Sequence, residues 1–403
     1  MQPRPRVLIV ADDLTGAMDT AGPFAQQGLA TRVVAEPLGC DPAAVSAARV
    51  VSLNTESRHL SEVQSAQRMQ ACAERFIGSQ SFEVIFKKID STLRGNVVSE
   101  TLALLRSCKR TSALVAPAFP AQGHTVRGGV VHVNGMALPQ TSFASDALSP
   151  PPLAPLPDVF RATSSERPVV SWVPGTNLPS AVGGIVIADS ESDADLATVL
   201  GLAKDRLADT LLVGSAGLAR ALARLLGSGV PEARPPATVD GPIVFVVGSR
   251  AASSREQVQR LRAMPGTVVL EAPNGMLTVP RDVPAAAQTV ILAVADPITG
   301  EGDARQVARG LSHAALQLSR QLGSRALVAT GGDTAIALLD ASRCSALEVL
   351  GELMPGIPYA RLTLDAKALL LVTKAGGFGN RETFVEIVRR LRPLATTVIA
   401  EVK

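Results

Sequence analysis

The sequence is poor in aromatic residues, which make up 3% of its 403 residues, although hydrophobic residues make up 46%. Its core must therefore be built from aliphatic side chains, which is typical of α/β proteins and not of all-β sandwiches. The shortage of aromatic rings also argues against a stacking platform for nucleic acid. The net charge is only +3 and no basic block stands out, so the chain has little with which to bind a phosphate backbone.

Cysteines are few and widely separated, with no CxxC pair: they are Cys40, Cys72, Cys108 and Cys344. This spacing favours reduced, buried thiols over a disulfide framework or a zinc site. Long apolar runs are also missing. The run VLIVA near the amino terminus is too short for a signal peptide, and no later run approaches the length of a membrane span. These absences predict a cytoplasmic protein that has neither a membrane nor a nucleic acid as its partner.

Short aliphatic runs alternate with longer amphipathic segments along the chain. The first run, at 7–11, is followed by a helical pattern for which Gly28 is a plausible end. Because 403 residues are too many for one ordinary core, the alternation predicts an α/β fold with two domains, each a mainly parallel sheet flanked by helices. Further strands are expected at 31–36, 49–54, 82–86, 112–117, 169–173, 183–189, 243–248, 288–296, 326–333 and 368–377.

The domain boundary is expected in the stretch 227–242, which is rich in glycine and proline and has no periodicity. It separates a predicted first domain, 1–230, from a second, 242–403. The proline-rich segment 149–157 precedes further strand candidates and is interpreted as an internal surface loop. An Asn134-Gly135 pair between two apolar runs predicts a β-hairpin inserted in the first domain.

The second domain contains three glycine-bearing loops, each directly after an expected strand. In an open parallel sheet such loops lie at the ligand-binding edge, where glycine lets the backbone approach a phosphate and the next helix presents free N–H groups. One such loop could be an ordinary tight turn, but three predict a nucleotide or polyphosphate site. The residues concerned are Ser249, Gly331, Gly332, Asp333, Thr334, Gly376 and Gly377.

The standard nucleotide signatures are absent from these loops. The chain has no GxxxxGK[ST] sequence, no GxGxxG after a strand and no protein-kinase loops. The nucleotide site is therefore inferred from the position of the glycines in the expected fold.

Two carboxylates, Asp12 and Asp13, follow the first expected strand and precede Gly16. They could coordinate Mg²⁺, or one of them could accept a proton from a sugar hydroxyl. A pair that caps the following helix is the structural alternative, and the sequence leaves both open.

The stretch FKKIDSTLRGN, 86–96, concentrates polar residues after the strand expected at 82–86: Lys87, Lys88, Asp90, Ser91, Thr92 and Arg94. Arg58 follows another expected strand and can offer a guanidinium fork to a carboxylate. Cations that hold a carboxylate, beside groups that hydrogen-bond vicinal hydroxyls, are what a polyhydroxy acid requires. His124, in a loop rich in glycine and proline, is a weaker candidate for this site.

The motifs ADDLTGAMDTA, NTESRH, KKIDSTLRGN, APAFPAQGHTVRGGVVHVNG, GSAGLARAL, VVGSRAASSREQV, ATGGDTA and KAGGFG occur in this order between about residues 7 and 390. Together they resemble the four-carbon acid sugar kinase family, formerly a domain of unknown function. Some members have GGET where this chain has GGDT.

The resemblance implies an N-terminal substrate domain and a C-terminal nucleotide domain that phosphorylate the terminal hydroxyl of a tetronate or oxo-tetronate with ATP. It implies that Asp12, Asp13, Arg58 and the 87–94 stretch face the acid sugar, and that the glycine loops face ATP. We expect in-line transfer across an interdomain cleft that closes at 227–242, with Mg²⁺ bridging the phosphates. Asp13 or Asp12 is the expected base, with Asp333 as the alternative, while Lys88 and Arg94 would hold the substrate carboxylate or the transferring phosphoryl group.

Two alternatives come from other functional classes. A phosphatase of the haloacid dehalogenase type also starts with a strand and aspartates, but it needs Asp-x-Asp, and here the two are adjacent. A non-catalytic acid-sugar-binding protein would explain the first domain and not the three loops of the second. The sequence does not decide between D-threonate, D-erythronate, L-threonate and a 3-oxo-tetronate, nor does it identify the Mg²⁺ ligands or the oligomeric state, for which a homodimer is one option.

Overall fold

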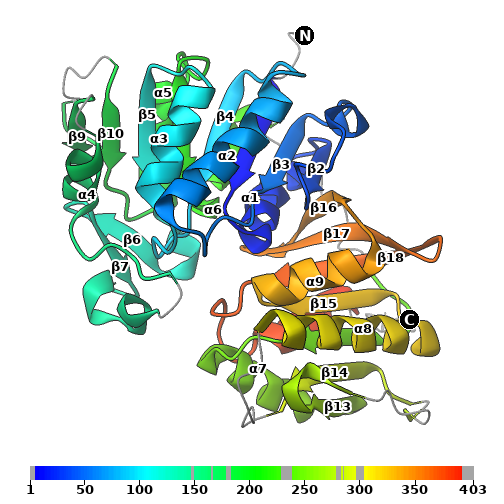
Figure 1. The fold of residues 1–403 in the computed structure, drawn as a ribbon. Helices are drawn as coiled ribbons and strands as arrows, with labels where there is room; N and C mark the ends of the chain where they lie inside the picture. Colours follow the sequence, from blue (N-terminus) through cyan, green and yellow to red (C-terminus); the bar gives the residue numbers. More distant parts are fainter. Residues whose placement is uncertain are drawn as a thin grey trace, which may run out of the picture. The chain divides into compact units, whose positions relative to one another are not determined.

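The protein is described from a computed structural model (Figure 1). It describes residues 5–146, 149–164, 167–177, 183–227, 238–277, 283–284, 286–295 and 304–392. The chain forms two compact units: the first is Met1–Glu232 with Ser345–Pro358, and the second is Ala233–Cys344 with Tyr359–Lys403. No helix of the described residues is long and apolar enough to cross a membrane.

The first unit is built on a parallel sheet in the order β2-β3-β1-β4-β11-β5-β10-β9. Its strands are β1 Val7–Ala11, β2 Thr31–Val34, β3 Val50–Asn54, β4 Val84–Lys88, β5 Ser112–Ala116, β9 Val169–Trp172, β10 Ile185–Ala188 and β11 Thr210–Gly214. The central strands β3, β1, β4 and β11 are fully buried, and β1 is aliphatic along its whole length.

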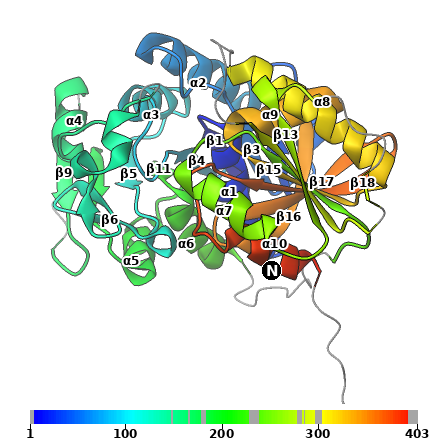
Figure 2. The same ribbon diagram turned by 90° about the horizontal axis from the view of Figure 1, so that it is seen from below.

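Helices cover both faces of this sheet (Figure 2). On one face α2 packs against α3, and on the other α6 packs against both α1 and α5. The helices of the unit are α1 Leu14–Gln26, α2 Glu62–Ile77, α3 Val97–Ser107, α4 Leu156–Thr163, α5 Asp193–Ala203 and α6 Ala216–Leu226.

A separate antiparallel sheet of three strands, β6 His124–Arg127, β7 Val130–Val133 and β8 Met136–Ala137, is inserted after β5. Asn134 and Gly135 join β7 to β8 with φ angles of 50° and 83°. Both angles are positive, which is the geometry that a two-residue hairpin turn requires. The hairpin predicted from the Asn-Gly pair is confirmed.

The second unit has a sheet in the order β13-β14-β12-β15-β18-β17, parallel except for β17, which is antiparallel to β18. Helices α8 and α9 lie on one face of this sheet, and α7 and α10 lie on the other (Figure 2). The elements are β12 Ile243–Val247, α7 Ala252–Arg262, β13 Thr267–Ala272, β14 Thr289–Val294, α8 Ala304–Leu322, β15 Ala326–Thr330, α9 Gly332–Ser342, β17 Ile357–Leu364, β18 Lys367–Lys374 and α10 Thr383–Leu391.

The structure confirms the α/β class and the two mainly parallel sheets. Strands β13, β16 and β17 were not among those expected from the sequence. The strand expected at 82–86 is β4, Val84–Lys88, so Lys87 and Lys88 are strand residues. Strand β16, Ala346–Met354, lies in the range expected for the second domain but belongs to the first unit, because it pairs with β2 and packs against α1. Of the boundary expected at 227–242, residues 228–237 lie outside the described part of the chain.

Candidate active site

Three neighbouring strands of the first unit, β3, β1 and β4, end at the same edge of the sheet. Asp12 and Asp13 follow β1, Arg58 follows β3, and the 89–96 loop follows β4. Because parallel strands bring their carboxyl ends to one edge, residues far apart in the sequence meet there.

Arg58 joins the two adjacent aspartates. Its Nε and Nη2 donate to Asp12 Oδ2 and Oδ1 at 2.7 and 3.0 Å, and its Nη1 donates to Asp13 Oδ2 at 2.8 Å. The two bonds to Asp12 make a bidentate pair, which a lysine could not reproduce. Burial would raise the pKa of Asp12, but the charges of Arg58 and of two lysines hold it below its ordinary value, so Asp12 stays ionised.

Asp13 is the N-cap of α1. Its Oδ1 accepts a hydrogen bond from the Gly16 N–H at 2.8 Å, which is the structural role that the sequence left open. Gly16 has no room for a side chain, since a Cβ there would lie 2.5 Å from Asp13 Oδ1 and 2.9 Å from Lys88 Nζ. The start of α1 therefore packs directly against the ammonium group of Lys88.

The loop after β4 lies against this pair. Gly95 has a φ of +88°, and a Cβ on it would lie 3.1 Å from Asp12 Oδ2 and 3.3 Å from Arg58 Cγ. Within the loop, Arg94 Nε donates to Asp90 Oδ2 at 2.7 Å, and Thr92 donates to the same oxygen. Burial would raise the pKa of Asp90, but Arg94 and Arg58 hold it well below its ordinary range.

Ser91 and His124 are brought together by the same loop, with 2.7 Å between Ser91 Oγ and His124 Nδ1. Both residues are buried, and burial lowers the pKa of His124. The Arg94 side chain is 25% exposed and lies over the ring of Phe143, 5.8 Å from its centroid. Its guanidinium is thus partly accessible, with its Nε fixed by Asp90 and its Nη1 3.8 Å from Asp146 Oδ2.

Lys87 is the predicted site residue that the structure places elsewhere. It is fully buried, and its Nζ lies 2.8 Å from Glu100 Oε2 on α3 and donates to the Lys88 carbonyl. The other Glu100 oxygen accepts from Ser57 Oγ at 2.6 Å. Successive residues of a strand point to opposite faces, so Lys87 points toward α3 while its neighbour Lys88 points toward α1. Direct contact of Lys87 with a ligand is therefore not available.

Asp19 is a residue that the sequence analysis missed. It lies on α1, buried, with its Oδ1 3.7 Å from Lys88 Nζ and 3.0 Å from Thr20 Oγ1. Burial, opposed by Lys88 and reinforced by Asp13 and Glu352, raises the pKa of Asp19 to about 7. Asp19 lies three residues after Gly16, so helical periodicity places both residues on the same face of α1. This spacing is the sequence signal by which Asp19 could have been predicted as a site residue.

Glu352, on β16, faces the same helix. Burial raises its pKa, although Arg220 Nη2 donates to its Oε2 at 2.7 Å and the Gly356 N–H donates to its Oε1. The edge of the first unit thus holds carboxylates in contrasting environments: Asp12 and Asp90 are kept ionised by arginines, whereas Asp19 titrates near neutral pH. Such contrasts within one site are typical of acid–base chemistry.

The three glycine loops of the second unit follow β12, β15 and β18, which are adjacent in the sheet. They converge on Ser249. A Cβ on Gly331, whose φ is +102°, would lie 3.7 Å from the Ser249 Cβ, and a Cβ on Gly376 would collide with the Ser249 hydroxyl. The predicted nucleotide residues are therefore neighbours in the fold.

The residues of this cluster differ in how accessible they are to a ligand. Gly331 is the N-cap of α9, and Asp333 is exposed in its first turn. Thr334 is buried, and its hydroxyl occupies the space where Gly248 lacks a side chain, so only its backbone could reach a ligand. A Cβ on Gly377 would meet no atom within 4 Å.

Lys374, at the end of β18, is buried and stabilises the loop that follows this strand by hydrogen bonds to its backbone. Its Nζ donates to the carbonyls of Ala375, Gly376 and Phe378 at 2.9, 3.1 and 2.9 Å. Burial lowers the pKa of Lys374 to about 7. An anion bound at the loop would favour the protonated form of this side chain.

Within the described part of the chain, no group of three or more His, Cys, Asp or Glu residues is arranged to hold a metal ion. A Mg²⁺ ion that binds mainly to substrate phosphates takes only one or two ligands from a protein, so it does not require such a group.

The fold and the two clusters define a two-domain α/β protein with a charged strand edge in its first unit and converging glycine loops in its second. Two family models match the chain, a sugar-binding N-terminal domain at residues 7–222 and a nucleotide-binding C-terminal domain at 244–384. The chain belongs to the four-carbon acid sugar kinase family.

Relatives of known activity are similar over nearly the whole chain. A D-threonate kinase of Bordetella bronchiseptica is 33% identical, covering 96% of this chain and 98% of the relative. A 3-oxo-tetronate kinase of Cupriavidus necator is 28% identical, with coverages of 96% and 98%. A solved structure from Bordetella bronchiseptica, a domain-swapped dimer with bound citrate, is 30% identical with a TM-score of 0.51, covering 96% of this chain and 99% of that one.

Proposed function

We propose that this protein is an ATP-dependent kinase that phosphorylates the terminal hydroxyl of a four-carbon acid sugar. The observation that carries the proposal is the charged edge of the first unit, where Arg58, Lys88 and Arg94 surround buried carboxylates and hydroxyls. D-Threonate is the first substrate to test, because the D-threonate kinase of Bordetella bronchiseptica is more similar to this chain than the 3-oxo-tetronate kinase. D-Erythronate and 3-oxo-tetronates are the other candidates.

The acid sugar would be held by cations and short polar groups of the first unit. Arg58 and Arg94 would bind its carboxylate, with Lys88 near the reacting hydroxyl. Asp90, Ser91 and Thr92 would hydrogen-bond the remaining hydroxyl groups. Lys87, paired with Glu100 in the interior, would support the end of β4 from behind and would not touch the substrate.

ATP would be bound by the second unit through Ser249, Gly331–Thr334 and Gly376–Gly377. The first N–H groups of α9 and the positive end of its dipole suit a phosphate, and the glycine backbone allows close approach. Bound Mg²⁺ would neutralise charge on the phosphates. Asp333, exposed in the first turn of α9, is the carboxylate of this loop that could hold such an ion.

The proton of the attacking hydroxyl needs an acceptor. Asp12 and Asp13 are the candidates from the sequence and Asp333 is the alternative, but Arg58 and the helix cap already engage the first two. Asp19 suits the role better, because a general base works best when its pKa lies near the working pH. Asp12 and Asp13 would then act by orienting Arg58.

The proposal is tested by measuring ADP release from ATP with purified protein and a panel of compounds. We expect turnover with at least one of D-threonate, D-erythronate and a 3-oxo-tetronate, and little turnover with a neutral four-carbon tetritol, because the arginines need a carboxylate partner. Equal rates with the tetritol would contradict acid recognition. Phosphate release from a sugar phosphate without ATP would support the phosphatase alternative, and binding without turnover would support the non-catalytic one.

A second prediction concerns Arg94. Arg94→Ala should raise the KM for the acid sugar roughly ten- to hundredfold, because a charged hydrogen bond is worth about 1.5–3 kcal/mol, and it should leave the KM for ATP nearly unchanged. Arg127→Ala is the control, since Arg127 forms an exposed ion pair with Glu191. A larger effect on ATP than on the acid sugar would assign Arg94 to the phosphates.

A further inference from the structure

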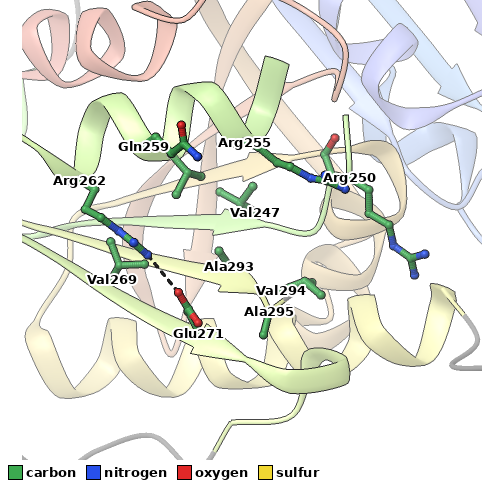
Figure 3. Close-up of a pocket in the computed structure, with 12 residues that line it drawn as sticks. Val247, Arg250, Arg255, Gln259, Arg262, Val269, Glu271, Ala293, Val294 and Ala295 are labelled. Carbon is green, nitrogen blue, oxygen red and sulfur yellow. Dashed lines mark hydrogen bonds and ion pairs between the residues drawn. The ribbon is translucent and has the colours of Figure 1, made fainter. Parts of the chain in front are cut away.

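A buried ion pair lies behind the charged edge of the first unit. Lys87 Nζ, on β4, is 2.8 Å from Glu100 Oε2, on α3, and the two side chains are 0% and 1% exposed. The ion pair of Arg262 and Glu271, which lines a cavity of the second unit, is 54% and 61% exposed, so both of its charges remain hydrated (Figure 3). Lys87 and Glu100 have lost their water, and only their contact and their hydrogen bonds offset that cost.

Glu100 connects this ion pair to the turn that follows β3. Its Oε1 accepts a hydrogen bond from Ser57 Oγ at 2.6 Å. The N–H groups of Ser57 and of its neighbour Arg58 both donate to the Asp12 carbonyl, at 3.0 and 3.3 Å. One carboxylate of α3 is therefore bonded to the end of β4 through Lys87 and to the turn after β3 through Ser57, whose backbone in turn holds the end of β1.

The turn after β3 does not keep its shape by local preference. Glu56 has a φ of +49°, in the left-handed region that residues other than glycine, asparagine and aspartate seldom adopt. Such a conformation persists when the surrounding structure holds it in place. Ser57, the next residue, supplies such a hold through its bond to Glu100, and Arg58 then starts from a fixed backbone position.

The energetics of a buried ion pair separate positioning from stability. Replacing such a pair by apolar residues of similar volume is often neutral or stabilising, whereas removing one partner alone is strongly destabilising. The Lys87–Glu100 pair is therefore weak evidence of a stabilising role. Its bond to Ser57, one residue before the arginine of the site, indicates a role in placing that arginine.

We propose that Glu100 is a positioning residue of the acid-sugar site: it holds Ser57 and thereby orients Arg58 toward Asp12 and Asp13. The inference rests on the proposed kinase function, in which Arg58 binds the substrate carboxylate. It adds the buried group that keeps this arginine in place from the opposite side of the strand ends.

The double variant Lys87→Met/Glu100→Leu tests the inference without leaving a buried charge unpaired. Because both charges are removed together, its melting temperature should be equal to or higher than that of the unaltered protein. Ser57 Oγ keeps a partner, since it lies 2.7 Å from Thr55 Oγ1. The KM for the acid sugar should nevertheless rise roughly 10- to 100-fold, because a displaced arginine binds the carboxylate poorly, and the KM for ATP should stay nearly the same.

Two single variants complete the comparison. Ser57→Ala keeps the ion pair and removes only its link to the turn, so it should raise the KM for the acid sugar roughly two- to tenfold. Thr101→Val is the matched control on α3, because Thr101 is buried beside Glu100 but its hydroxyl donates to the Val97 carbonyl of its own helix. It should leave both KM values unchanged.

Hydrogen exchange at the Arg58 side chain reports its position without turnover. The Nε–H donates to Asp12 Oδ2, so its ¹H–¹⁵N signal, identified by its absence from Arg58→Lys, should exchange slowly in the unaltered protein. In the double variant it should exchange at least about tenfold faster.

Unchanged exchange, or an unchanged KM for the acid sugar, in the folded double variant would overturn the inference and leave the kinase proposal intact. If the double variant does not fold, the same two measurements on Ser57→Ala decide in the same way. If the unaltered protein phosphorylates no acid sugar, the kinase proposal fails, and exchange at Arg58 still decides whether Glu100 positions this side chain.

Discussion

Asp19→Asn is expected to lower kcat by about 10²- to 10⁴-fold, the usual effect of losing a general base, and at the same time to make the protein more stable at pH 8. Asparagine has nearly the same shape but cannot accept the proton. The KM values should change little, because the side chain is not assigned to ground-state binding. In the unaltered enzyme, kcat should rise as the pH increases through about 7, since Asp19 must lose its proton to act.

The stability effect follows from the sign of the pKa shift. The folded protein raises the pKa of Asp19 from 3.8 to about 7, so it holds this proton more tightly than the unfolded chain. The resulting stability is fully present below pH 3.8 and is lost as the pH rises to about 7. Above that pH the buried charge lowers the free energy of unfolding by an amount on the order of a few kcal/mol, which asparagine avoids.

Thermal unfolding of both proteins at pH 5 and pH 8 measures this difference, and the gain should be larger at pH 8. Glu352→Gln is a matched control, because Glu352 is another buried carboxylate that faces α1 and has a raised pKa. It should change stability without the large fall in kcat. A kcat for Asp19→Asn within tenfold of the unaltered enzyme would remove Asp19 from the mechanism.

Gly377→Val should raise the KM for ATP roughly ten- to hundredfold, corresponding to the loss of a charged hydrogen bond of about 1.5–3 kcal/mol. A Cβ at this position would meet no protein atom within 4 Å, so the substitution projects into the open space where the phosphates are proposed to bind. The KM for the acid sugar and the melting temperature should stay the same. Steady-state kinetics with each substrate varied in turn measures the separation.

Gly201→Val provides the control for this experiment. Gly201 is an exposed residue of α5 with no atom within 4 Å of an added Cβ, so the same substitution is made in the first unit, away from any proposed site. It should leave both KM values unchanged. If Gly377→Val keeps its affinity for ATP, the loop after β18 does not bind the phosphates, whatever the other two glycine loops do.

The local sequence was sufficient for the features that depend on short-range physical chemistry. Strand β1 is a continuous aliphatic run followed by two aspartates, and the sequence predicted its bounds because a strand buried on both faces has no polar positions. The Asn134-Gly135 turn was predictable because few residue pairs adopt two positive φ angles. The glycine loops were predictable as a set because parallel strands bring their carboxyl ends to one edge.

The tertiary structure decided what depends on partners distant in the sequence. Lys87 and Lys88 are adjacent and identical in type, yet one pairs with Glu100 in the interior and the other lies near Asp19, because alternate strand residues face different helices. The raised pKa of Asp19 exists only because packing removes the side chain from water. Strand β16 joins the first unit through its pairing with β2, more than 300 residues earlier in the chain, and no local pattern encodes such a partner.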